Sequence, residues 1–250
     1  MDRRSPVQPS PAEIARTLAS GLLPGEAHVR QHRGRLRMRH ATTPEGETFL
    51  LTRAGGTLER ALRPAPGETD TALVLAVDDV VPVQGGPDHG RVWLSGWAER
   101  LDGDDARAAA DGYAAVAPTG DLLGIGSSHS IYRFSVDEVR LERGGILVEI
   151  DPVDFVSATP DPIQAVEREL LADLNAHHLG ELAEVLARRV PGPATFRAVR
   201  LDRYGVVLEA STVDVPVRIS LPEPARDAAH LTELLHPALC PNCAGHPASR

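Results

Sequence analysis

Four residues near the C-terminus have the types and the spacing of metal ligands. The segment runs His236-x3-Cys240-Pro-Asn-Cys243-x2-His246. Two thiolates separated by two residues can chelate one soft metal ion, and the flanking imidazoles could complete four ligands. The pattern is not a c-type haem attachment motif, in which a His directly follows the second Cys. It predicts zinc or an iron–sulfur cluster, while a redox-active thiol pair, a site shared by two copies and a tail without any ligand stay open.

A second polar cluster, formed by Asn175, His177 and His178, falls within a predicted helix. Asp161 can cap this helix, and Pro162 is well placed at its first position, where the missing N–H of proline is not needed. The helix is expected to continue past His178, and its polar cluster forms either the wall of a site or the satisfied edge of a core. Apolar residues recur along it at helical spacing: Ile163, Val166, Leu170, Leu174, Leu182, Val185 and Leu186.

Arginines are concentrated in a third stretch, with five between Arg30 and Arg39. Leu36, Met38 and His40 alternate with three of them, which predicts a half-buried strand with a basic outer face. Such a face could hold a phosphate or a carboxylate, or it could simply be solvated.

The segment from Gly124 to His129 resembles a glycine-rich phosphate loop only in part, because the third glycine is absent and a strand is expected to follow. Neighbouring residues in a strand point to opposite faces, so Ser128 and His129 are not expected to form a nucleophile–base pair. No triad or pair of catalytic carboxylates is evident. The sequence therefore leaves open whether the protein is an enzyme, and any catalysis would come mainly from a bound cofactor.

The composition excludes several kinds of chemistry. All 26 positively charged side chains are arginine, so Schiff-base catalysis, a pyridoxal-phosphate anchor and the lysine of P-loop or kinase sites are ruled out. A net charge of -9 argues against nucleic-acid binding through a basic surface. No apolar run approaches the roughly 20 residues of a membrane span. The two cysteines cannot form a disulfide framework, and the N-terminus lacks the apolar region of a secretion signal, so a cytoplasmic location is expected.

The order of predicted elements divides the chain near residue 160 into a mostly antiparallel β-barrel with flanking helices and a smaller α-β-β-β-α unit, an α+β class. A capping box from Ser10 to Glu13 begins the first helix. The expected boundaries are a disordered tail at 1–10, the barrel at 11–157, the α-β-β-β-α unit at 158–236 and the Cys/His tail at 237–250. The clearest strand patterns are Thr48–Thr52, Ala72–Val77, Arg91–Trp97, Ile131–Val136, Ile146–Ile150, Thr195–Leu201, Val206–Ala210 and Val215–Leu221.

Three segments, RVWLSGWAERL, SIYRFSVDEVRLE and VDFVSATPDP running into ERELLADLNAHH, resemble a known pair of domains. They are similar to the FMN-binding-type split β-barrel of the pyridoxamine 5'-phosphate-oxidase-like superfamily, joined to its C-terminal companion domain. HugZ-type haem oxygenases and glutamyl-tRNA reductase-binding proteins have this pair. The resemblance extends from about Pro11 to Leu235, and it implies a homodimer with ligand clefts at the interface between the two copies.

The resemblance also implies candidate ligand residues. The family's helix commonly has the pattern His-Leu/Met-Asn-x-Asp-His, which Asn175 and His178 match, whereas Asp173 and His177 depart from it. HugZ-type proteins bind haem with a donor from the C-terminal tail, a role that His246 could take here.

Flavin is the alternative cofactor that the resemblance implies. Arg53 and Thr57 lie near the expected phosphate clamp, but the usual arginine and lysine set cannot be complete without lysine. The resemblance thus favours a haem-binding protein, one that degrades haem or handles haem or iron. An FMN-dependent oxidoreductase and a non-enzymatic regulator of tetrapyrrole metabolism are the alternatives.

Overall fold

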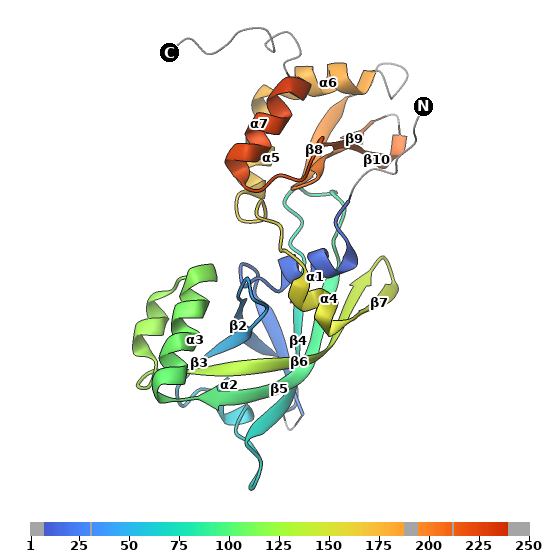
Figure 1. The fold of residues 1–250 in the computed structure, drawn as a ribbon. Coiled ribbons are helices and arrows are strands. Elements are labelled where there is room, and N and C mark those ends of the chain that lie inside the picture. The colour runs from blue at the N-terminus through green and yellow to red at the C-terminus, as the bar shows by residue number, and fades with distance from the viewer. Residues whose placement is uncertain (1–7, 31, 188–194, 212, 240–250) are drawn as a thin grey trace, which may run out of the picture. The chain divides into compact units, whose positions relative to one another are not determined.

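The computed structural model describes residues 8–30, 32–187, 195–211 and 213–239. Its internal contacts divide the chain into two units (Figure 1). One unit comprises Ser10–Val80 and Asp88–Pro160. The other comprises the described residues from Asp161 onward, those before Ser10, and the Val81–Pro87 loop, which connects two strands of the first unit. No helix within the described ranges is both long and apolar enough to cross a membrane.

The first unit is a closed antiparallel barrel of six strands with one additional strand (Figure 1). The strand order is β3-β2-β1-β4-β5-β6-β7, and β3 also pairs with β6, which closes the barrel. The predicted α+β class and the barrel are therefore confirmed. The strands are β1 (Gly25–Val29), β2 (Leu36–Thr42), β3 (Thr48–Arg53), β4 (Asp70–Asp78), β5 (Arg91–Leu101), β6 (His129–Arg143) and β7 (Ile146–Ile150).

Alternation of side chains decides which face of each strand is buried. In β2, Met38 and His40 are buried whereas Arg37 and Arg39 are exposed, which confirms the predicted strand with a basic outer face.

In β5, the register shifts after Ser95, where a Cβ on Gly96 would lie only 1.9 Å from a backbone carbonyl of β6. The absence of a side chain at this position therefore allows the two strands to approach closely.

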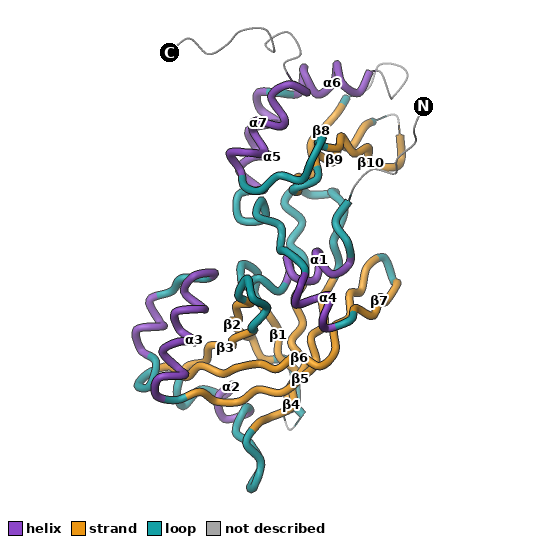
Figure 2. The backbone as a smooth tube through the Cα atoms, in the orientation of Figure 1, coloured by secondary structure: helices purple, strands orange, loops and turns teal. Residues whose placement is uncertain are grey.

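Among the described residues, four α-helices and one 3-10 helix accompany the barrel. Figure 2 shows the helices in purple around the strands. The capping box predicted for the first of them is present, with Ser10 and Glu13 each bonding the other's backbone N–H. The longest, α3, packs against β2 and β6 over a small apolar core that includes Phe49 and Tyr113. The helices are α1 (Pro11–Leu18), α2 (Thr57–Ala61), α3 (Gly103–Val116), the 3-10 helix η1 (Gly120–Gly124) and α4 (Pro152–Ser157).

A fully buried arginine joins three segments of the barrel unit. Arg16 of α1 donates hydrogen bonds to the backbone carbonyls of Thr43, at 2.8 Å, and of Ala158, at 3.2 Å. Its guanidinium also lies 5.3 Å from the centroid of the Phe155 ring. Burial lowers the pKa of this guanidinium. Arg16 thus connects α1 to the β2–β3 turn and to the segment after α4.

The second unit has a three-stranded antiparallel sheet in the order β10-β9-β8 with three helices. The predicted single helix from Asp161 past His178 is wrong, because Pro162–Val166 form turns and the chain leaves helical geometry at His178. Asp161 caps only the turn, accepting from Ile163 N at 2.9 Å. The elements are α5 (Glu167–His177), α6 (Leu179–Ala187), β8 (Phe196–Asp202), β9 (Gly205–Ala210), β10 (Val213–Ser220) and α7 (Ala228–Leu239).

Substitution of the buried arginine tests how the barrel unit is held together. Arg16→Ala should lower the free energy of unfolding by about 3 kcal/mol, because it leaves buried carbonyls without donors and creates a cavity. Urea unfolding measures this loss. The matched control is Arg107→Ala on the exposed side of α3, which should change stability by less than about 0.5 kcal/mol. Equal stability of the two variants would contradict the role of Arg16.

Candidate functional site

A cavity of about 740 Å³ opens in the barrel unit between the Gly21–Pro24 segment, β2 and the segment that follows α3. We call it the β2 cavity. Ligand pockets in proteins commonly measure about 300–1,000 Å³, so this volume is sufficient for a cofactor-sized molecule. Most of its walls are apolar, and they include Leu22, Leu23, Pro24, Met38, Tyr113 and Val116.

The charged residues of this lining are all basic. Arg37 and Arg39, from the exposed face of β2, line the cavity, and no Asp or Glu is among its lining residues. Guanidinium groups bind carboxylates and phosphates through paired N–H donors. The β2 cavity therefore favours a ligand that is largely apolar and carries an acidic group.

His40 is a buried, unpartnered member of the same lining. It is 1% exposed, and neither of its ring nitrogens has a hydrogen-bond partner among the described residues. Its ring packs against the backbone of Gly25, where a Cβ would lie 3.0 Å from Nδ1. Burial lowers the pKa of the imidazole to about 4, so His40 is neutral at pH 7. Neutral imidazole is the form that binds a metal ion.

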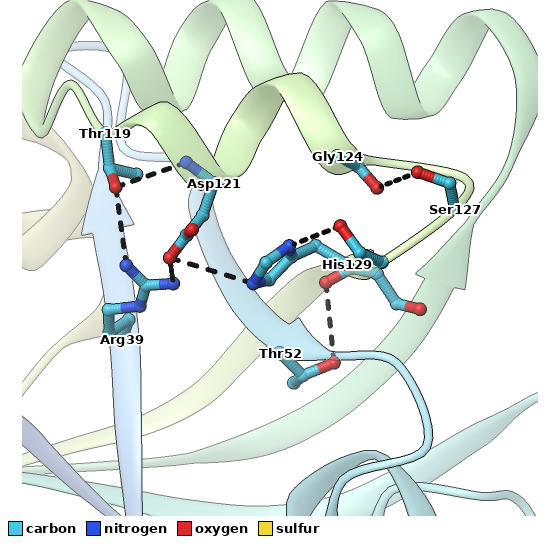
Figure 3. A network of polar contacts seen from close by, with 9 residues as sticks. Arg39, Thr52, Thr119, Asp121, Gly124, Ser127 and His129 are labelled. Atoms are coloured by element: carbon cyan, nitrogen blue, oxygen red, sulfur yellow. Dashed lines mark hydrogen bonds and ion pairs between the residues drawn. The ribbon is translucent and has the colours of Figure 1, made fainter.

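A polar network extends from the cavity to the end of the barrel (Figure 3). Arg39 donates to a carboxylate oxygen of Asp121 and, at 3.4 Å, to the hydroxyl of Thr119. His129 Nε2 lies 3.7 Å from the same Asp121 oxygen. Its Nδ1 lies 3.1 Å from Ser128 Oγ. Arg39 is therefore already paired with the Asp121 carboxylate of the same chain. The local sequence pattern does not predict this contact.

The contact between Ser128 and His129 corrects a prediction from the sequence. These neighbours were expected to point to opposite faces of a strand, but β6 begins only at His129 and Ser128 lies in the preceding turn. Strand alternation therefore does not apply to them. Gly124 permits the contact, because a Cβ there would lie 2.2 Å from the Ser128 hydroxyl oxygen.

Arg53 lies at the end of β3 beside this network. It pairs in register with His129 across the seam that closes the barrel, and its charge contributes to lowering the pKa of Asp121. Thr57, the other residue considered for a phosphate clamp, accepts a hydrogen bond from Arg60 within its own short helix. A cofactor-binding role for Arg53 stays a prediction, and the structure pairs this residue with His129.

In the second unit, the structure separates two residues that the sequence grouped together. The Asn175 amide donates to the carbonyl of Ala198 at 2.9 Å and accepts from its N–H at 2.8 Å, which ties α5 to β8. His178 instead lines an apolar cavity of about 210 Å³, together with His236 of α7. Hydrogen bonding to β8 explains the position of the Asn175 side chain. The cofactor-binding roles of Asn175 and His178 stay predictions.

The predicted metal site at the C-terminus falls largely outside the described residues. Cys240, Cys243 and His246 are not among them, whereas His236 is an exposed residue near the end of α7. Across the described ranges, no group of three or more His, Cys, Asp or Glu side chains could hold a metal ion. Zinc or iron–sulfur binding by the tail stays a prediction.

Comparisons with known proteins agree with this architecture. No protein-family model matches the chain, and no curated protein matches it. Among solved structures, a heme binding protein from Mycobacterium smegmatis is similar over 93% of this chain and 97% of its own, with 22% identity and a TM-score of 0.69. Atu2129 from Agrobacterium tumefaciens, of unknown function, has 18% identity over 93% of this chain and 99% of its own, with a TM-score of 0.45.

A third structure is a Clostridium acetobutylicum protein related to general stress protein 26, of the pyridoxinephosphate oxidase family. It covers 59% of this chain and 99% of its own, with 13% identity and a TM-score of 0.38. The closed barrel and the match to the M. smegmatis protein confirm the split β-barrel fold with a second α+β unit that the sequence resemblance implied.

Removal of the Asn175 amide tests whether it acts as a tie between α5 and β8. Asn175→Ala should destabilise the second unit by about 2 kcal/mol, because the backbone groups of Ala198 lose both partners. Hydrogen exchange at the Ala198 amide should become correspondingly faster. The neighbouring exposed His177→Ala is the control and should leave that exchange unchanged. A rate unaffected by Asn175→Ala would contradict the structural role.

The burial of His40 predicts a dependence of stability on pH. An unfolded chain protonates His40 below about pH 6.5, whereas the folded protein keeps it neutral down to about pH 4. The stability that this group contributes is therefore present above pH 6.5 and is lost as the pH falls toward 4. We expect a loss of about 3 kcal/mol over this window.

Urea unfolding of the wild type and of His40→Leu between pH 7 and pH 4 measures this loss. The difference between the two free energies of unfolding should change with pH because of His40 alone, since the other titrating groups are common to both proteins. One of them is Asp161 in the second unit, whose pKa burial raises to about 6 and whose effect has the opposite sign. Parallel pH profiles for the two proteins would contradict the burial of a neutral His40.

Proposed function

We propose that this protein binds haem in the β2 cavity. The observation that carries the proposal is the combination of apolar walls, two arginines without a lining carboxylate, and His40, which is buried, neutral and unpartnered. Haem requires an apolar slot for its macrocycle, cations for its propionates and an axial donor such as neutral His. Each requirement has a candidate residue here.

Bound haem would supply iron-centred redox chemistry, and the protein residues would bind and orient it. Arg37 and Arg39 would take the propionate carboxylates at the mouth of the cavity. His40, on the opposite, buried face of β2 from these arginines, is the candidate for the iron, and the apolar lining residues would exclude water from the macrocycle.

The other cavities are less suited to an anionic tetrapyrrole. A cavity of about 590 Å³ beside His28 and Trp93 has both Arg140 and Glu142 in its lining. A cavity of about 370 Å³ next to it has Arg30 with Asp137 and Glu138. Their carboxylates would repel propionates, whereas the β2 cavity has two arginines and no lining carboxylate. The cavity of about 210 Å³ that contains His178 and His236 is smaller than the usual ligand pocket.

The similarity to the M. smegmatis heme binding protein also supports the proposal, because it extends over nearly the whole of both chains. We further propose that the protein acts as a cytoplasmic homodimer and that His246, in the tail, provides a second donor. Haem degradation and haem or iron handling are both compatible with such a site.

Two alternatives remain distinct from haem binding. A flavin-dependent oxidoreductase would need a phosphate clamp, and the chain has no lysine to complete the usual arginine and lysine set. A regulator of tetrapyrrole metabolism without catalysis would bind a protein partner and could use the same cavity for sensing. Flavin released on denaturation would support the first alternative.

A haemin titration followed by absorption tests the proposed site. The wild type should give a saturable Soret band, and His40→Ala should shift this band and weaken binding by at least about tenfold, because an iron donor is lost. His28→Ala is the control, since His28 lies outside the β2 cavity, and it should bind as the wild type does. A spectrum that haemin titration leaves unchanged, or equal binding by both variants, would overturn this site.

A further inference from the structure

Two basic side chains, Arg39 and His129, approach one carboxylate beside the β2 cavity (Figure 3). Arg39 and His129 both face the same oxygen of Asp121, and the charge of Arg53 also acts on it. The hydrogen bond from Arg39, together with these charges, lowers the pKa of Asp121. Asp121 is therefore ionised at neutral pH.

The interaction between Arg39 and Asp121 is accessible to solvent. Their side chains are 46% and 43% exposed. Ion pairs with this exposure stabilise a fold only weakly, because water and salt screen both charges. A dissolved anion could consequently compete with Asp121 for Arg39.

The 3-10 helix η1, which carries Asp121, and the turn that follows it have their own backbone support. Ser128 N–H donates to the carbonyl of Gly124 at 2.9 Å, and Gly126 N–H donates to the carbonyl of His129 at 3.0 Å. The backbone N–H of Asp121 itself donates to Thr119 Oγ1 at 3.5 Å. The Asp121 carboxylate participates in none of these bonds, so its removal should leave the turn folded.

The basic cluster is continuous with the β2 cavity, because Arg39 and Thr119 belong to the lining of the cavity and also to the network around Asp121. A ligand whose apolar body occupies the cavity would therefore have its acidic group close to Arg39. The acidic group of such a ligand would take the position beside Arg39 that the Asp121 carboxylate takes in this structure.

We infer that Asp121 is an internal substitute for the acidic group of a ligand, and that the carboxylate or phosphate of a bound molecule displaces it from Arg39 and His129. The basis is the approach of these two basic groups to one exposed carboxylate at the edge of the β2 cavity. The identity of the ligand as haem rests on the proposed function. The anion subsite itself does not.

Asp121→Asn in the full-length protein tests this inference, because it removes the competing charge and keeps the side-chain volume. The variant should bind haemin about threefold to tenfold more tightly than the wild type, whereas its affinity for haemin dimethyl ester, which has no free carboxylates, should be unchanged. Inorganic phosphate at millimolar concentration should raise the Tm of the variant more than that of the wild type. Arg39→Ala added to Asp121→Asn should abolish both effects.

Asp104→Asn is the matched control, because Asp104 is an exposed acid of α3 that pairs only with the nearby Arg107 among the described residues. It should bind haemin as the wild type does. If Asp121→Asn gains neither haemin affinity nor stabilisation by phosphate, the inference is overturned. If haemin binds to no variant but phosphate stabilises Asp121→Asn through Arg39, the anion subsite stands and the haem proposal fails.

Discussion

Closure of the barrel by the pairing of β3 with β6 is the constraint on which the rest of this structure depends. The seam extends from Thr48 opposite Phe134 to Arg53 opposite His129. Without it both strands would have unpaired edges. With it, β3 lies between β2 and the start of β6, and the network around Asp121 joins Arg39 of β2 to His129 of β6 (Figure 3). The site is therefore a consequence of how the sheet closes.

The two-residue alternation of side chains in a strand predicted the parts of the site that lie on β2. Alternation placed Met38 and His40 inside the barrel and the arginines of β2 outside, because one strand has one buried face. Periodicity could not predict that Asp121 reaches Arg39, since that contact joins residues 82 positions apart. It also misplaced Ser128 relative to His129, because alternation is a property of strands and Ser128 lies in a turn.

The second unit shows how tertiary contacts override a helical pattern. An Asp-Pro pair followed by apolar spacing predicted a helix from Asp161, yet regular helix begins at Glu167. There the buried Glu167 carboxylate accepts from Leu201 N at 2.9 Å and lies 3.5 Å from Arg200. A buried carboxylate needs such partners. Because α5 begins at Glu167, this side chain can reach them. The partners come from β8, so no local pattern around Asp161 could reveal them.

The arrangement around Asp121 also resolves a conflict between stability and binding. A cavity that binds an acidic ligand needs several basic groups close together, and these groups repel one another when no anion is present. An exposed carboxylate from the same chain relieves that repulsion in the ligand-free protein. The same carboxylate competes with the ligand. The free energy by which it stabilises the ligand-free site is subtracted from the free energy of ligand binding. A site of this design would bind its ligand less tightly than the same basic groups would without Asp121.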